Sequence, residues 1–289
     1  MPLMAAPAVL GIRPAIEEDR SKLANLLHFE THVHRHLDWR RPLEWLGAQP
    51  FLIVESGDRI TGAIACPPDP AEVSWIRLFA ANSRGNVNEI WYTLFKAALD
   101  RLSALDVRYI PAIPLQDWFR RLLEKTGFKL RDKVLVLDWV PVEKPQDAGT
   151  SGAIIRPMGE SDLEAVHQVD HLAFSSLWQN SREAVELAFE HSAVATLIEE
   201  DGQVASYQIS TQSPQGLHLA RLATHPKFQG RGLAKALVRD LMGALKKRGE
   251  NRLTVNTQAS NRPSLALYEN MNFKRTTEEF PVYVYDLKL

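Results

Sequence analysis

Two glycines and several basic residues lie just before a predicted helix in the second half of the sequence. The run is Lys227-Phe228-Gln229-Gly230-Arg231-Gly232-Leu233-Ala234, with Lys235 after it. The first backbone amides of a helix have no partner within the helix, and with the helix dipole they form an anion site. Glycine lets a phosphate approach the backbone closely, and the basic side chains suit a phosphorylated ligand. The alternative is an ordinary helix start with surface charges, and this turn alone does not decide between the two.

The elements around this turn can be predicted from the residue pattern. Residues 216–224 are expected to form a strand that ends at His225-Pro226, because proline lacks a backbone donor. Leucines then recur every four residues from Leu233 to Leu245, which indicates an amphipathic helix. A second strand is predicted at 253–257. A short helix with proline near its first position follows from Asn261.

These two motifs together resemble the GCN5-related N-acetyltransferase (GNAT) superfamily. Its phosphate signature follows the fourth strand and is met by Gln229, Gly232 and Ala234. Its second signature, which follows the next strand, is met by Asn261, Ala266, Leu267-Tyr268-Glu269 and Phe273. The resemblance implies an acetyltransferase fold that takes acetyl-CoA as co-substrate.

The resemblance also assigns roles to individual residues. The strands near Thr224 and Thr257 would part, and backbone groups of one strand would bind the pantetheine arm. The turn amides would hold the pyrophosphate, and the start of the short helix would contact the coenzyme. Tyr268 would be catalytic, by protonating or hydrogen-bonding the departing thiolate. The full expected set of coenzyme-binding residues is Leu222, Ala223, Thr224, Gln229, Gly230, Arg231, Gly232, Leu233, Ala234, Asn261, Ser264 and Tyr268.

The general base is not evident from the sequence. Acetyl transfer requires the acceptor amine to lose a proton. Ribosomal-protein N-terminal acetyltransferases of the superfamily place a glutamate on the fifth strand, where this sequence has Asn256. This departure argues against protein N-termini as substrates. Possible bases elsewhere are His218, His225, Glu199 and Glu200, each of which can also be an ordinary strand or surface residue.

The two halves of the chain repeat each other. The repeat appears in four matches in the same order. They are Ile12-Arg13-Pro14 with Ile155-Arg156-Pro157, a hairpin at 51–65 with one at 195–210, Arg77-Leu78 with Arg221-Leu222, and Glu124–Phe128 with Glu269–Phe273. We therefore predict an α/β fold of two tandem GNAT domains, each a mixed sheet flanked by helices. The predicted bounds are 1–139 for a degenerate copy, 140–152 for a linker and 153–289 for the catalytic copy.

The first copy lacks the residues that carry the chemistry. Its turn, Asn82–Glu89, has no register that restores the small residues, and Glu89 places a negative charge where a phosphate would lie. Leu123 stands at the tyrosine position and has no acidic proton. We expect this half to keep the fold without binding coenzyme productively.

Four histidines near the start of the chain have an unusual spacing. His28, His32 and His36 recur every four residues, with His34 between them, so three would share one face of a helix. Such a face could bind zinc or contact substrate, but a solvated helix face is expected, and no metal site is predicted.

The overall composition narrows the classes of function. The 34 basic and 35 acidic residues give no global field that would draw the chain to nucleic acid or membranes. The single cysteine, Cys66, fits a reducing compartment and a buried side chain, and no segment is apolar enough to cross a bilayer. We expect a cytoplasmic monomer or homodimer that acetylates a small-molecule or peptide amine. The alternative is a sensor that binds coenzyme A or a nucleotide without catalysis.

Overall fold

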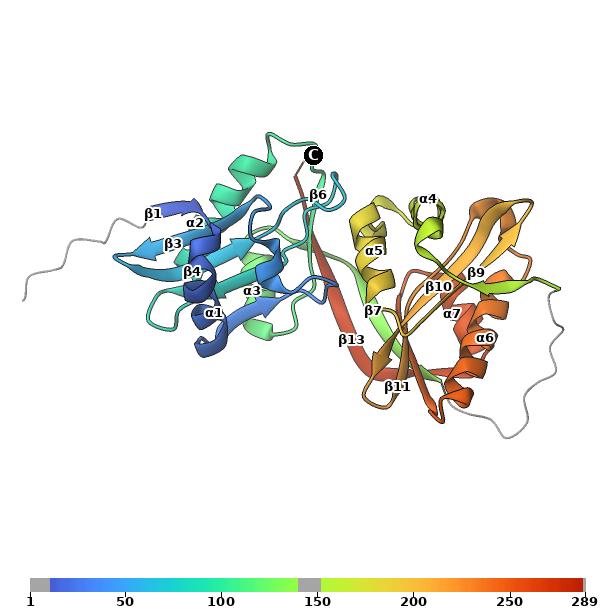
Figure 1. Ribbon diagram of the computed structural model, residues 1–289. Helices are drawn as coiled ribbons and strands as arrows, with labels where there is room; N and C mark the ends of the chain where they lie inside the picture. Colours follow the sequence, from blue (N-terminus) through green and yellow to red (C-terminus); the bar gives the residue numbers. More distant parts are fainter. Residues whose placement is uncertain (1–10, 140–151, 288–289) are drawn as a thin grey trace, which may run out of the picture. The chain divides into compact units, whose positions relative to one another are not determined.

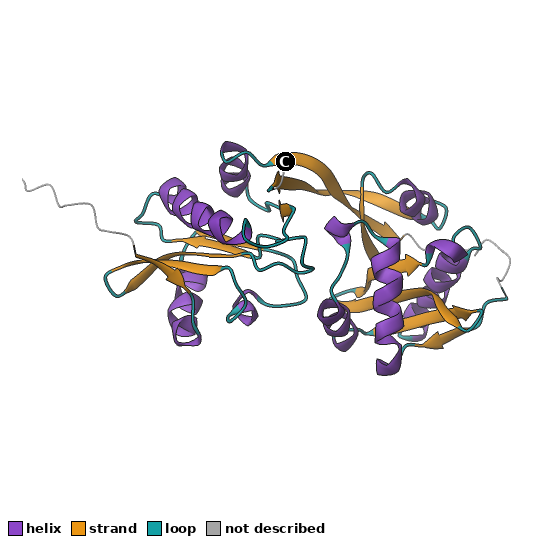
Figure 2. Cartoon of the chain, turned by 90° about the horizontal axis from the view of Figure 1, so that it is seen from above, coloured by secondary structure: helices purple, strands orange, loops and turns teal. Residues whose placement is uncertain are grey.

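The structure is a computed structural model of the 289-residue chain and describes residues 11–139 and 152–287. These residues form two compact units, the first made of 11–131 with 281–287 and the second of 132–139 with 152–280. Each is an α/β fold with helices on both faces of a sheet (Figure 2). The α/β prediction is therefore confirmed, whereas the predicted linker lies outside the described residues, except for Gly152.

The first unit is built on a five-stranded sheet with the order β1-β3-β4-β5-β2. The strands β3 and β4 form the predicted hairpin around Ser56-Gly57-Asp58, and Gly57 has a φ of 59° in the turn. The elements are β1 (Gly11–Pro14), α1 (Arg20–Phe29), β2 (His32–Arg35), β3 (Phe51–Ser56), β4 (Arg59–Ala65), β5 (Leu78–Ala81), α2 (Val87–Leu102), β6 (Tyr109–Ala112), α3 (Asp117–Lys125) and β7 (Lys129–Trp139).

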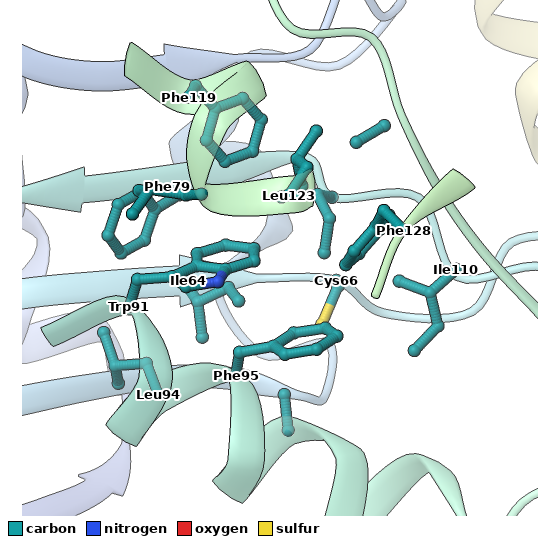
Figure 3. Packing of buried hydrophobic residues seen from close by; sticks show 14 of the residues in the cluster. Ile64, Cys66, Phe79, Trp91, Leu94, Phe95, Ile110, Phe119, Leu123 and Phe128 are labelled. Atoms are coloured by element: carbon teal, nitrogen blue, oxygen red, sulfur yellow. The ribbon is translucent and has the colours of Figure 1, made fainter. Parts of the chain in front are cut away.

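Both faces of this sheet are buried. Because strand side chains alternate between faces, Phe51 and Ile53 pack with α1, while Leu52 and Val54 join the opposite core. That second core is rich in aromatic rings from α2 and α3 (Figure 3). Cys66 lies fully buried within it, and burial raises the pKa of its thiol to about 12. The cysteine is thus a packing residue, as its sequence context indicated.

The second unit has the sheet order β8-β9-β10-β11-β12-β7-β13. Figure 1 labels β9, β10 and β11 of this sheet. The predicted strand at 216–224 and the helix from Leu233 are both present with those starting points. None of the described helices is long and apolar enough to span a membrane. The elements are β8 (Ile155–Pro157), α4 (Leu163–Ala173), α5 (Arg182–Glu190), β9 (Val194–Glu200), β10 (Gln203–Ser213), β11 (Gly216–Thr224), α6 (Leu233–Lys247), β12 (Arg252–Gln258), α7 (Arg262–Glu269) and β13 (Phe273–Asp286).

Each unit contains a strand segment from the other half of the sequence. In the second unit, Val134–Asp138 of β7 pair with β12, and in the first, Tyr283–Asp286 of β13 pair with β6. The compact units therefore depart from the predicted bounds at β7 and β13. Residues 132–139 belong to the second unit, and residues 281–287 belong to the first. The alternating pattern of a strand indicates which side is buried, but it does not indicate which neighbour the strand pairs with.

The histidines near the start do not share a helix face, so that expectation was wrong. His28 lies in α1, which ends at Phe29. His32 and His34 lie in the strand β2, which begins at His32. A strand brings alternate residues to one side, so His32, His34 and His36 point the same way. Their rings contact Trp118, Phe119 and Trp75, respectively. Within the described chain, no group of three metal-ligating side chains is placed to hold an ion.

We predict that burial of His34 makes stability depend on pH. Burial lowers the pKa of His34 to about 4, so the folded ring stays neutral while the unfolded ring gains a proton below pH 6.5. Stability is thus fully present above pH 6.5 and falls as the pH drops toward 4, by about 2 kcal/mol at pH 5 from this group. Urea unfolding of wild type and His34→Phe checks this.

The variant should lose part of the dependence between pH 6.5 and 4. Above pH 7 the two stability curves should run parallel, which serves as the internal control. Equal slopes below pH 6.5 would show that His34 carries no such linkage.

Candidate functional site

The strands β11 and β12 pair only over their first residues and then part. Parallel pairing runs from Gly216–Arg252 to Leu219–Val255. Beyond it, β11 stays paired with β10 as far as Thr224, and β12 stays paired with β7 as far as Gln258. A bulge leaves Ala220 without a partner on β10 at the point of divergence, and bulges bend the strand that carries them. The result is the gap between 220–224 and 256–258 that the resemblance implied.

Hydrogen bonding with β10 determines which backbone groups of β11 face this gap. The amide of His225 donates to the carbonyl of Ala205 over 2.9 Å, and the carbonyl of Ala223 accepts from Ser206 Oγ over 2.8 Å. Backbone groups of successive strand residues point to opposite sides. Those of Leu222 and Thr224 therefore face the gap, whereas those of Ala223 face β10. The sequence predicts Ala223 among the coenzyme-binding residues, whereas its backbone groups are directed at β10 and away from the gap.

The turn before α6 presents unbonded amides beside this gap. Gly230 and Gly232 have φ angles of 78° and 80°, a left-handed conformation in which other residues are strained. A Cβ on either would meet no atom within 4 Å. The amides from Gly230 to Ala234 donate to no oxygen of the described residues. Gln229 Nε2 donates to the carbonyl of Thr224 over 3.2 Å, which fastens the turn to the end of β11.

The positive charge of the turn is partly engaged. Arg231 forms an ion pair of 2.9 Å with Glu200 and lies over the ring of Phe228. Lys235 lies one turn into α6, whose first turn carries no acidic residue. The positive potential at the start of α6 therefore comes mainly from its unbonded amides and the helix dipole.

The expected residues of the short helix serve as a cap and as core. Asn261 caps α7, because its side chain accepts from the amide of Ser264 over 3.2 Å. Tyr268 is 4% exposed and its ring contacts Phe273. Burial raises the pKa of the Tyr268 hydroxyl, so the group is protonated at neutral pH. Among the described residues, that hydroxyl has no hydrogen-bond partner, and it remains able to donate.

A buried ionic cluster at the bulge was missed by sequence reasoning. Arg221, the residue after the bulge, donates to both carboxylate oxygens of Asp170 on α4 over 2.6 and 2.8 Å. Tyr207 donates to the same carboxylate, and the Asp170 side chain is fully buried. Arg221 also holds the carbonyl of Trp178 and stacks on Phe174. The cluster therefore links the segment after α4 to the bulged strand β11. In the sequence, the only indication of Arg221 was the repeat of its Arg-Leu pair at Arg77-Leu78.

The structure separates the four possible bases. Glu199 pairs with Arg156 over 2.5 Å, Glu200 pairs with Arg231, and His225 Nδ1 accepts from the amide of Lys227. His218 instead lies on β11 opposite Thr254, with its Nδ1 2.8 Å from Thr254 Oγ1. Burial lowers the pKa of His218, so its ring is neutral. It stands one residue before the last pair of β11 and β12, close to the start of the gap.

A mixed sheet, parted parallel strands and a turn of unbonded amides at a helix start form the arrangement that the resemblance to the GNAT superfamily implied. Residues 163–273 match the sequence model of the Acetyltransferase (GNAT) family. A match of 123 residues at 27% identity to the [ribosomal protein bS18]-alanine N-acetyltransferase of Escherichia coli covers 43% of this chain and 82% of that protein.

Two solved structures resemble the chain over nearly its whole length. A GCN5-related N-acetyltransferase from Sphaerobacter thermophilus is 15% identical, with a TM-score of 0.62, and the likeness covers 99% of this chain and 98% of that one. A tandem GNAT protein from the clavulanic acid biosynthesis pathway is 14% identical, with a TM-score of 0.64, and the likeness covers 97% and 99%. Residues 163–273 therefore carry the likeness to the GNAT family, and the chain shares the fold of these two solved structures.

Proposed function

We propose that the protein is an N-acetyltransferase that moves the acetyl group of acetyl-CoA to a primary amine of a small molecule or peptide by direct attack. The observation that carries the proposal is the gap beside β11, which adjoins the unbonded amides of Gly230–Ala234. The match to the acetyltransferase family and the activity named for the E. coli relative support it. The tandem division into a degenerate first copy and a catalytic second copy belongs to the same proposal.

The residues of the second unit would hold acetyl-CoA at three points. The backbone groups of Leu222 and the amide of Thr224 would bond the pantetheine arm as a neighbouring strand does. The amides of the turn would bind the pyrophosphate. The start of α7, with Asn261 and Ser264, would contact the coenzyme beside the gap.

The chemistry would need a base and a donor. His218 would take the proton of the amine as nitrogen bonds to the thioester carbonyl carbon, and the carbon–sulfur bond then breaks. A neutral imidazole is better matched to an α-amino group, with a pKa near 8, than to a lysine amine near 10.4. Tyr268 would donate a hydrogen bond to the departing sulfur. Its raised pKa makes complete transfer of its proton to a thiolate unfavourable.

The sensor alternative is separated from the enzyme by thiol release. A protein that binds acetyl-CoA in calorimetry, but releases no thiol with any member of a broad amine panel, would be a binding module. Thiol release that depends on one class of amine would establish the enzyme and identify its acceptor. The panel should include α-amino peptides, because the E. coli relative is named for an alanine of a ribosomal protein.

Gly232→Glu should weaken acetyl-CoA binding at least about tenfold, which corresponds to 1.4 kcal/mol. The substitution strains a position with a φ of 80° and puts a negative charge where a phosphate is expected. Calorimetry measures the change. Gly243→Glu is the matched control, because it adds the same charge to α6 at a position where a Cβ meets no atom within 4 Å. Equal affinity of the two variants would show that the phosphate site lies elsewhere.

Tyr268→Phe should lower kcat roughly 10- to 100-fold, because a hydrogen bond to a charged group is lost from the transition state. The KM for acetyl-CoA should change little, since the ring and its packing remain. Tyr92→Phe on the exposed surface of α2 controls for loss of a tyrosine hydroxyl. Undiminished turnover would remove Tyr268 from the mechanism.

His218→Gln should lower kcat/KM roughly 10- to 100-fold by removing the base. Below pH 6.5 the wild-type kcat/KM should fall more steeply than protonation of the acceptor amine alone explains, because the pKa of His218 is lowered but His218 still gains a proton; this additional acid limb should disappear in the variant. His225→Gln should retain both the rate and the limb. A variant that keeps the wild-type limb would assign the base to another group.

A further inference from the structure

The strand β2 occupies, in the first unit, the position that corresponds to the gap of the second. The residues before β5 run beside β6, because Ser74 and Ile76 donate to the carbonyls of Tyr109 and Pro111 over 2.9 Å each. This matches the short parallel pairing of β11 with β12. The neighbour of β5 is β2. The amide of His36, directly after β2, donates to the carbonyl of Arg77, directly before β5, over 2.9 Å.

The phase of hydrogen bonding identifies the backbone groups that β2 takes up. Asn82 donates to the carbonyl of Thr61 in the first unit, as His225 donates to that of Ala205 in the second. By alternation, Phe79 and Ala81 correspond to Leu222 and Thr224, the residues that face the gap. In the antiparallel ladder of β2 with β5, His34 lies opposite Phe79 and His32 lies opposite Ala81. In the first unit β2 thus bonds the backbone groups that, in the second, have no strand partner; there only the Thr224 carbonyl is bonded, by the Gln229 side chain.

The turn before α2 is likewise bonded by oxygens of the chain itself. The amide of Ser83 donates to Glu30 Oε2 over 2.7 Å. The amides of Gly85 and Asn88 donate to the side-chain oxygens of Asn82 and Asn86 over 3.1 and 3.0 Å. Glu30 directly follows α1, two residues before β2 begins at His32. One short segment therefore supplies both an anion to the turn and a strand to the sheet.

Aromatic packing fixes this segment in place. The ring of His34 stacks on Phe119 at 4.1 Å, and that of His36 stacks on Trp75 at 4.7 Å. His34 Nε2 also lies 3.1 Å from the carbonyl of Ile76. Opening the gap of the first unit would expose these rings and break the β2–β5 ladder together.

We infer that the segment Glu30–His36 is a built-in substitute for coenzyme in the first unit. Its strand takes the place of the pantetheine arm, and the Glu30 carboxylate takes the place of an anionic group at the turn. The inference rests on the proposed function for the identity of the ligand that the gap of the second unit accepts. If the inference holds, each chain binds one coenzyme. The backbone of the first copy would exclude coenzyme even if its turn carried the phosphate signature.

Amide hydrogen exchange on the full chain tests this, with and without saturating acetyl-CoA. In the free protein, the amides of Phe79, Ala81 and Ser83 should exchange slowly, and those of Leu222 and Thr224 at least about tenfold faster. Acetyl-CoA should slow only Leu222, Thr224 and the turn from Gly230, and should titrate to one per chain. Slowing at Phe79 or Ala81, or two coenzymes per chain, would overturn the inference.

The same exchange experiment tests the proposed function through different amides. If acetyl-CoA leaves Leu222 and Thr224 unchanged, the proposed coenzyme site fails, while slow exchange at Phe79 and Ala81 without ligand still supports the closed first copy. Rapid exchange of Phe79 and Ala81 in the free protein refutes the closure alone.

A variant isolates the role of the carboxylate. Glu30→Ala should speed exchange at Ser83 roughly tenfold or more, because a hydrogen bond to a charged group is lost. The exposed Glu18→Ala is its control. Unchanged exchange at Ser83 would refute the assigned role of Glu30.

Discussion

The loss of pairing between two parallel strands is the constraint on which the site depends. Strands that stayed in register would bond all their backbone groups to each other, and no ligand could be held by main-chain contacts. The bulge at Ala220 ends that register. It turns Arg221 toward Asp170 and leaves Leu222 and Thr224 facing the gap. The edge of the gap and the buried ion pair therefore both follow the same irregularity, within four residues of Ala220.

Backbone groups that lose their partners in a sheet destabilise the fold unless they find other hydrogen bonds, because buried donors and acceptors are nearly always paired. The two copies meet this requirement differently. In the first unit, β2 completes the hydrogen bonding and a carboxylate bonds the turn. In the second, the Thr224 carbonyl accepts from the Gln229 side chain, and the other equivalent groups of the described residues are available to solvent or ligand. The two copies thus keep the same fold and differ in what bonds these backbone groups. In the first unit the partner is the chain itself.

Much of the second unit could be predicted because local signals agreed with the fold. Gly230 and Gly232 adopt the left-handed conformation that favours glycine, and Asn261 with Pro263 starts a helix as such pairs do. The histidines were misread because His28, His32 and His36 fit a helical period, while His32, His34 and His36 fit a strand equally well. Tertiary pairing with β5 decided between them. The partner of Arg221 and the backbone phase at Ala223 depend on contacts distant in sequence, for which the residues carry no local signal.

The exchange of terminal strands has a consequence for synthesis on the ribosome. The strand β6 finds its neighbour in Tyr283–Asp286, which are made long after β6 itself. In the second unit, β12 pairs with a segment of β7 that is already available when β12 emerges. The unit that begins to form first is therefore the last to be completed. Until then its edge at β6 is an unpaired template for other strands, so vectorial folding leaves the first unit exposed while the second unit is made.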